Sequence, residues 1–137
     1  MSPAGRVSRW LAAGIVVAVI VLGSGRPVSA HASLLTTNPA ADSVLDIPPG
    51  EIVLRFTEPV DPTDESIRLV TADGTPVELG SVTEDRGSAS LSAAITGELD
   101  DGSYVVAWSA VSADSHPISG AFVFSVGAPS QDAEALI

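Results

Sequence analysis

The chain has 137 residues and is strongly acidic, with 17 aspartates and glutamates against 6 basic residues and a formal net charge of −11. Such a surface repels nucleic acid and anionic membranes and attracts cations, so we expect no nucleic-acid partner. The chain has no cysteine, and its single methionine is Met1. This excludes disulfides and thiolate ligands, and it leaves no soft sulfur ligand beyond the first residue.

The first 30 residues have the pattern of a secretory signal peptide. Arg6 and Arg9 form a basic start, residues 11–22 are apolar apart from one glycine, and residues 28–30 read Val-Ser-Ala, a small-residue cleavage signal. The apolar run is shorter than the roughly 20 residues that a membrane-spanning helix needs, so we favour cleavage over an uncleaved anchor. We therefore expect an exported protein, periplasmic or extracellular, whose mature chain begins at His31.

Short apolar segments separated by turn residues fill the rest of the chain. We expect strands at residues 32–35, 51–56, 66–71, 77–79, 90–95, 104–112 and 118–126. In the second of these, Ile52, Leu54 and Phe56 alternate with polar or smaller residues, as in a strand with one buried face. No helical apolar period of useful length follows residue 30. About seven strands with close turn signals predict an all-β fold, an antiparallel β-sandwich.

The turns carry further signals. Asp73–Gly74 predicts a hairpin, and residues 61–65 predict a polar loop. Tyr104 follows a turn and opens a strand, which resembles the tyrosine corner of Greek-key sandwiches. We expect one domain at residues 31–126 and a flexible tail at residues 127–137.

Two histidines and one aspartate are the candidate chemical groups. Asp114 and His116 are spaced i,i+2, so in extended backbone they would point to the same side. If cleavage leaves His31 first, that residue offers an imidazole and a free α-amine. Their unperturbed pKa values, about 6.5 and about 8, leave little proton competition with a metal at neutral pH.

Three nitrogens and one carboxylate oxygen suit Cu(II) in a tetragonal arrangement, although Zn(II) accepts the same donors tetrahedrally. Acidic residues at Asp61, Asp64 and Glu65, and at Asp100 and Asp101, raise a Ca²⁺ alternative, but the EF-hand loop pattern is not met. No serine lies in a nucleophile-elbow context, so nucleophilic catalysis is not expected.

Several segments of the sequence together resemble the CopC family of exported copper-resistance proteins. They are the start at residues 31–34 (HASL), the turn at 38–40 (NPA), residues 54–60 (LRFTEPV), residues 102–104 (GSY) and residues 112–120 (SADSHPISG). The similarity extends over residues 31–126.

The resemblance implies an immunoglobulin-like Greek-key sandwich that binds one Cu(II) per chain through His31, Asp114 and His116. Glu58 falls at a position where some members place a glutamate beside the copper, either as a weak ligand or as a carboxylate that does not bind. Some relatives also have a methionine-rich loop for Cu(I). With no methionine after Met1, we expect no such Cu(I) site here.

The function we expect is an exported Cu(II)-binding protein that sequesters or carries copper for homeostasis or resistance. We expect a monomer without enzymatic activity or small-molecule substrate, which hands copper to a CopD-like membrane copper transporter. Residues 31–137 contain no second long apolar run, so the transporter would be a separate chain unless this sequence is part of a longer protein.

Two other functions remain open on sequence grounds. His31 and His116 would also fit the histidine brace of a copper monooxygenase, but Asp114 would fill a position that oxygen needs. In a metal-free interaction sandwich both histidines would be incidental.

Overall fold

The computed structural model describes residues 31–131, which form nine strands and no helix. The strands are β1 (Leu34–Asn38), β2 (Val44–Leu45), β3 (Glu51–Phe56), β4 (Asp61–Thr71), β5 (Pro76–Val77), β6 (Thr83–Asp85), β7 (Ser90–Ala94), β8 (Gly102–Val111) and β9 (Pro117–Val126). Within this part of the chain, no helix has the length and apolar character needed to cross a membrane. The predicted signal peptide lies outside the described residues.

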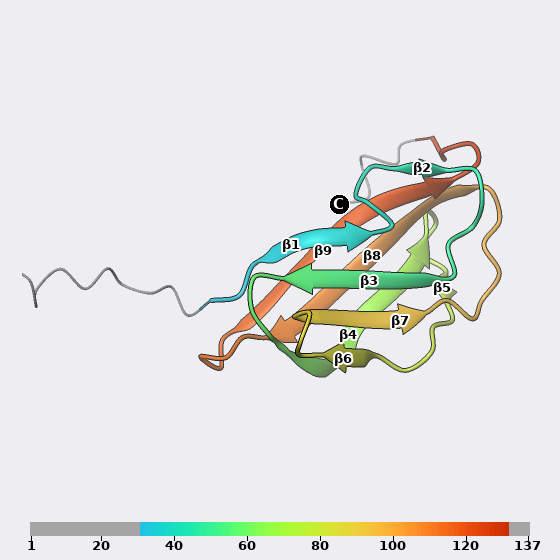
Figure 1. Cartoon of the computed structure of the whole chain (residues 1–137). Helices are drawn as coiled ribbons and strands as arrows, with labels where there is room; N and C mark the ends of the chain where they lie inside the picture. The colour runs from blue at the N-terminus through green and yellow to red at the C-terminus, as the bar shows by residue number, and fades with distance from the viewer. Residues whose placement is uncertain (1–30, 132–137) are drawn as a thin grey trace, which may run out of the picture.

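The strands form two stacked sheets, which cross at an angle in Figure 1. One sheet has the order β1-β3-β7-β6 and the other the order β2-β9-β8-β4-β5. In chain order these are the A-B-E-D and G-F-C arrangements of an immunoglobulin domain, with β2 and β5 added at the two edges of the second sheet. The predicted immunoglobulin-like sandwich is confirmed.

The strand set differs from the prediction in several places. The first strand runs over Leu34–Asn38 and not residues 32–35, and the strand expected at residues 77–79 is Pro76–Val77. β4 begins at Asp61, so the expected polar loop at residues 61–65 is wrong: Asp61 pairs with Val111, and the register shifts between Pro62 and Ile67. β2 and β6 were not predicted, because two or three residues are too few to show alternation. β2 also runs parallel to β9, so the sandwich is antiparallel apart from this pair.

The core lies between the two sheets and follows the predicted alternation of β3. Ile52, Leu54 and Phe56 are 0%, 0% and 2% exposed. They pack in one hydrophobic cluster with residues of the other sheet, among them Val106 and Phe124. Burial of alternate side chains from both inner faces is what holds two such sheets together.

The start of β8 is fixed by the predicted tyrosine corner. The Tyr104 hydroxyl donates to the carbonyl of Asp100 at 2.7 Å, and the ring stacks on Phe124 with 5.5 Å between centroids. The predicted hairpin at Asp73–Gly74 joins β4 to β5, with Gly74 at a φ of 87°. Glycine adopts such a left-handed conformation without the penalty that a Cβ imposes.

The segment after β9 is anchored to the sandwich over its described length. The Ser103 N–H donates to the Ser130 hydroxyl at 2.9 Å, and the Ser130 N–H donates to the Ser103 hydroxyl at 3.0 Å. Residues 132–137 of the predicted tail lie outside the described residues.

Candidate metal centre

The three predicted ligands come from both sheets and meet at one end of the sandwich. His31 precedes β1, an edge strand of the four-stranded sheet, and Asp114 and His116 lie in the turn between β8 and β9 of the other sheet. Figure 1 shows the start of β1 and the β8–β9 turn at the same end of the molecule. The sandwich therefore brings together residues that are far apart in the chain.

One oxygen of Asp114 lies between the two imidazoles. Its Oδ2 is 2.5 Å from His31 Nδ1 and 3.0 Å from His116 Nδ1. The imidazole rings are 4.7 Å apart between centroids and inclined by 31°. One ligand atom from each of the three residues lies within 4.8 Å of the others, so the group can hold a metal ion.

The two histidines are open to solvent and the aspartate is only partly exposed. The side chains of His31 and His116 are 56% and 62% exposed, whereas that of Asp114 is 18% exposed. A cation from solution can therefore reach the imidazoles directly, and the Asp114 carboxylate lies further inside the group. Such access suits a site that takes up and releases a metal.

The β8–β9 turn, and not an extended strand, makes Asp114 and His116 converge. The Ser112 N–H donates to the carbonyl of His116 at 3.0 Å, and the Ser115 N–H donates to the carbonyl of Ser112 at 2.9 Å. Ser115 has a φ of 66°, in the left-handed region. The expectation that extended backbone places both side chains on one side is therefore wrong in mechanism, although the two side chains do meet.

Hydrogen bonds keep Asp114 ionised. The Ser112 hydroxyl donates to Asp114 Oδ1, and the His116 N–H donates to the same oxygen at 3.3 Å. The bond from Ser112 is the main cause that lowers the pKa of Asp114 to about 2, against a partial opposing effect of burial. At neutral pH a cation would have no proton to displace from this carboxylate.

Residues 32 and 33, which precede β1, place His31 at the site. The Ser33 N–H donates to the Thr57 hydroxyl at 2.9 Å, and the Thr57 N–H donates to the carbonyl of Ser33 at the same distance. Ala32 is 4% exposed and belongs to the core cluster. Residues 32 and 33 are held in this way, and this brings the main chain of His31 to the end of the sandwich where Asp114 lies.

Glu58 lies near His31 but outside the three-residue group. A shallow hollow is lined by His31, Ser33, Thr57 and Glu58. The atoms that lie within 4.8 Å of one another come from His31, Asp114 and His116, and Glu58 contributes none. This position fits a carboxylate beside the metal better than a ligand, and its role stays a prediction.

The acidic residues considered for Ca²⁺ do not form a comparable group. Within residues 31–131, the histidine–aspartate group is the one set of three metal-binding side chains that converges. Asp61 instead accepts a hydrogen bond from Arg86 Nη1 at 2.9 Å. The same guanidinium nitrogen pairs with Glu84 at 2.5 Å.

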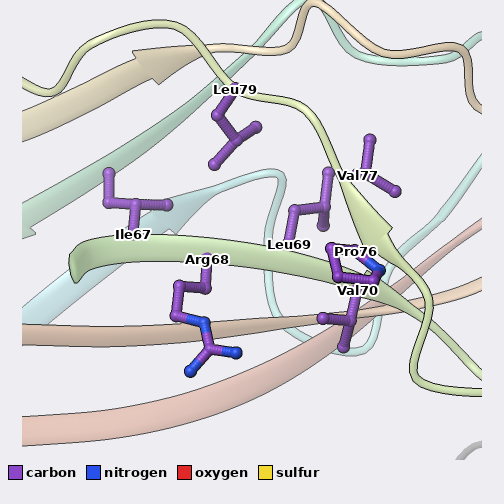
Figure 2. A pocket seen from close by; sticks show the side chains of 7 residues that line it. All are labelled: Ile67, Arg68, Leu69, Val70, Pro76, Val77 and Leu79. Carbon is purple, nitrogen blue, oxygen red and sulfur yellow. The ribbon is translucent and has the colours of Figure 1, made fainter.

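A second hollow, beside β4 and β5, is apolar. Figure 2 shows Ile67 and Leu69 pointing to one side of β4 and Arg68 to the other, as strand alternation requires. Val77 and Leu79 complete the apolar wall. The residues that line this hollow include no carboxylate or imidazole, so it lacks the metal-ligand types found at the histidine site.

Sequence reasoning did not identify Ser112 and Thr57 as residues that organise the site. Serine and aspartate side chains often bond nearby main-chain groups in turns, so residues 112–116 carried a general turn signal, but not one specific to Ser112. Thr57 had none, because its contact with Ser33 depends on the pairing of β1 with β3.

The strand order and the histidine–aspartate group at one end of the sandwich define the class of protein. It is an immunoglobulin-like sandwich with a solvent-exposed group of side chains able to hold a metal ion. Residues 34–127 match the model of the CopC domain, and the chain therefore belongs to the CopC family. This is a family of copper-binding proteins concerned with copper resistance and transport.

Individual relatives agree with this assignment. The chain is 26% identical over 121 residues to the copper transport protein CutJ of Bacillus subtilis (strain 168), an alignment that covers 88% of this chain and 22% of the relative. It thus spans about a fifth of the length of that curated relative.

Two solved structures resemble the sandwich. CopC from Methylosinus trichosporium OB3b has a TM-score of 0.64 and 28% identity, covering 74% of this chain and 98% of that one. PcoC from Escherichia coli, described as a methionine-rich copper resistance protein, has a TM-score of 0.62 and 31% identity. The match covers 72% of this chain and 100% of the PcoC chain. The present chain has a single methionine, Met1.

Proposed function

We propose that this protein is an exported Cu(II) carrier that binds one copper ion per chain through His31, Asp114 and His116. The observation that carries the proposal is the convergence of two imidazole nitrogens on one ionised carboxylate oxygen, at 2.5 and 3.0 Å. The copper is cargo, taken up from and returned to solution or a partner.

The donor set favours Cu(II). Imidazole nitrogens and a carboxylate oxygen suit Cu(II), which stands above Ni(II) and Zn(II) in the Irving–Williams order. Soft sulfur ligands, which would select Cu(I), are absent after Met1. The ring nitrogen of His31 that faces Asp114 is Nδ1, the one closer to its own main chain. Cleavage before His31 would add the α-amine as a third nitrogen that can chelate together with Nδ1.

The exposure of both histidines supports a carrier that exchanges its metal. A partner surface can approach the imidazoles without any rearrangement of the sandwich, because both side chains are more than half exposed. A CopD-like membrane copper transporter is the proposed recipient. The longer relative CutJ is itself described as a copper transport protein.

A carrier fits the group better than a copper monooxygenase. Asp114 Oδ2 lies between the two imidazoles, where a brace enzyme would need a free position for oxygen. A second measurement distinguishes a copper carrier from a copper monooxygenase: glycan oxidation by the copper-loaded protein in the presence of ascorbate or peroxide. We expect no oxidised glycan. Glycan oxidation by the wild type that is lost in His116→Ala would instead favour a monooxygenase.

The test of the carrier proposal is a Cu(II) titration of the protein that begins at His31. We expect one Cu(II) per chain. A variant that retains residues 27–30 before His31 lacks the free amine, and we expect its affinity to fall by at least the roughly 10- to 100-fold that loss of a group beside a metal ligand costs. Competition with a chromophoric chelator gives both affinities. Equal affinities would show that the amine of His31 is not a ligand.

A further inference from the structure

Ser112 lies directly behind the candidate site, between the end of β8 and the turn, and is 1% exposed. Its main chain closes the turn: its N–H donates to the carbonyl of His116 at 3.0 Å, and its carbonyl accepts from the Ser115 N–H at 2.9 Å. These backbone bonds close the turn without the hydroxyl, which makes further contacts of its own with Asp114 and the His116 carbonyl.

That hydroxyl has one proton and two acceptors in reach, Asp114 Oδ1 and the carbonyl of His116 at 3.0 Å. The carboxylate is charged and the carbonyl is not, so the carboxylate is the stronger acceptor. The His116 N–H also points at Oδ1, at 3.3 Å. Both donors behind the site thus hold Oδ1, and Oδ2 faces the imidazoles of His31 and His116.

We infer that Ser112 is a positioning residue for copper binding, whose hydroxyl holds Asp114 Oδ1 so that Oδ2 alone is presented to the metal. This inference rests on the proposed function. It says that Ser112 orients Asp114, one of the proposed copper ligands. Without the hydroxyl, Oδ1 keeps only the bond from the His116 N–H at 3.3 Å, so the carboxylate can rotate more easily about its terminal bond and present either oxygen or both. Groups that orient a ligand in this way change the affinity and the coordination of the metal without touching it.

The test compares three serine variants of the protein that begins at His31. Ser112→Ala removes the hydroxyl and keeps the backbone bonds of the turn. We expect Cu(II) affinity roughly 10- to 100-fold weaker, together with a changed EPR hyperfine splitting and a shifted visible band. Ser112→Thr keeps a hydroxyl donor and is expected to restore the wild-type spectrum.

The matched control is Ser103→Ala. Ser103 is 2% exposed, and its hydroxyl bonds that of Ser125 at 2.8 Å, but it lies at the start of β8, whereas Ser112 follows the end of that strand. Its loss removes an equally buried hydroxyl far from the histidines. We expect the copper spectrum and affinity of this variant to be those of the wild type.

The inference is overturned if folded Ser112→Ala binds Cu(II) with wild-type affinity and spectrum, or if Ser103→Ala shows the same losses. Should Ser112→Ala not fold, Ser112→Thr decides, because a changed copper spectrum in that variant contradicts the role. The wild-type titration tests the proposed function separately. The positioning is also measured without copper, from the imidazole ¹⁵N shifts of His31 and His116. These shifts should change in Ser112→Ala and stay unchanged in Ser103→Ala.

Discussion

At the scale of single residues, the two carboxylates near the histidines are not equivalent. Asp114 touches both imidazoles through Oδ2, while Glu58 lines the hollow beside His31 and contributes no atom to the converging group. A ligand and a neighbouring carboxylate both attract a cation, but only the ligand also sets the coordination of the metal. The difference can be measured with two substitutions that each remove one charge at nearly constant shape.

Asp114→Asn is expected to weaken Cu(II) binding by more than the roughly 10- to 100-fold typical of a residue beside a ligand, and Glu58→Gln by less than about 10-fold. The EPR spectrum should change in the first variant and stay close to wild type in the second. Chelator competition gives the affinities. Equal losses in the two variants would mean that the site acts through its net negative charge and not through a specific oxygen.

At the scale of elements, the tyrosine corner links the start of β8 to the preceding turn and gives the fold a defined response to alkali. Burial is the main cause that raises the pKa of Tyr104, and the nearby charge of Asp100 adds to it. Because the folded pKa lies above the ordinary value of about 10, the corner contributes its full stability below pH 10. That contribution is lost as pH rises through the folded pKa.

Tyr104→Phe removes both the hydrogen bond and the titrating hydroxyl, and the two contributions to stability show at different pH values. Loss of the bond to the Asp100 carbonyl is expected to lower the free energy of unfolding by about 1 kcal/mol at pH 8. As pH rises above the ordinary tyrosine pKa of about 10, the wild type should lose stability more steeply than the variant. The chain has one tyrosine and no lysine, so few other groups titrate in this window. Urea unfolding at several pH values measures both effects, and parallel pH profiles would contradict the assignment.

At the scale of the whole molecule, the two sheets are joined by an aromatic contact near the site. Phe56 at the end of β3 meets Trp108 of β8 edge to face, with 5.4 Å between centroids. Gly120 of β9 lies opposite Trp108 and leaves room for the indole ring, since a Cβ there would be 2.8 Å from Trp108 Cζ2. The absence of a side chain at residue 120 therefore allows Trp108 to reach across to Phe56.

Gly120→Ala is expected to destabilise the fold by about 1–3 kcal/mol, because the added methyl overpacks the indole. Gly50→Ala is the control, since a Cβ at Gly50 would meet nothing within 4 Å, and we expect it to be neutral or slightly stabilising. Thermal unfolding with tryptophan fluorescence measures both. Equal melting temperatures for the two variants would show that Trp108 moves aside at little cost.

The amino-acid pattern by itself determined the sandwich and the chemical groups of the candidate site. Alternation in β3, the Asp73–Gly74 hairpin and the Tyr104 corner are local signals, which depend on neighbours in the chain and need no partner strand to be recognised. The donor types at His31, Asp114 and His116 were equally visible, because ligand chemistry is a property of the side chain.

Only the tertiary structure decided how these groups meet. The contact of His31 with Asp114 requires both sheets to stack with β1 and the β8–β9 turn at one end. The start of β4 at Asp61 and the existence of β2 and β6 depend on partner strands that supply their hydrogen bonds. The physical reason is the same in each case: the energy of these contacts comes from residues distant in the chain, which no local pattern encodes.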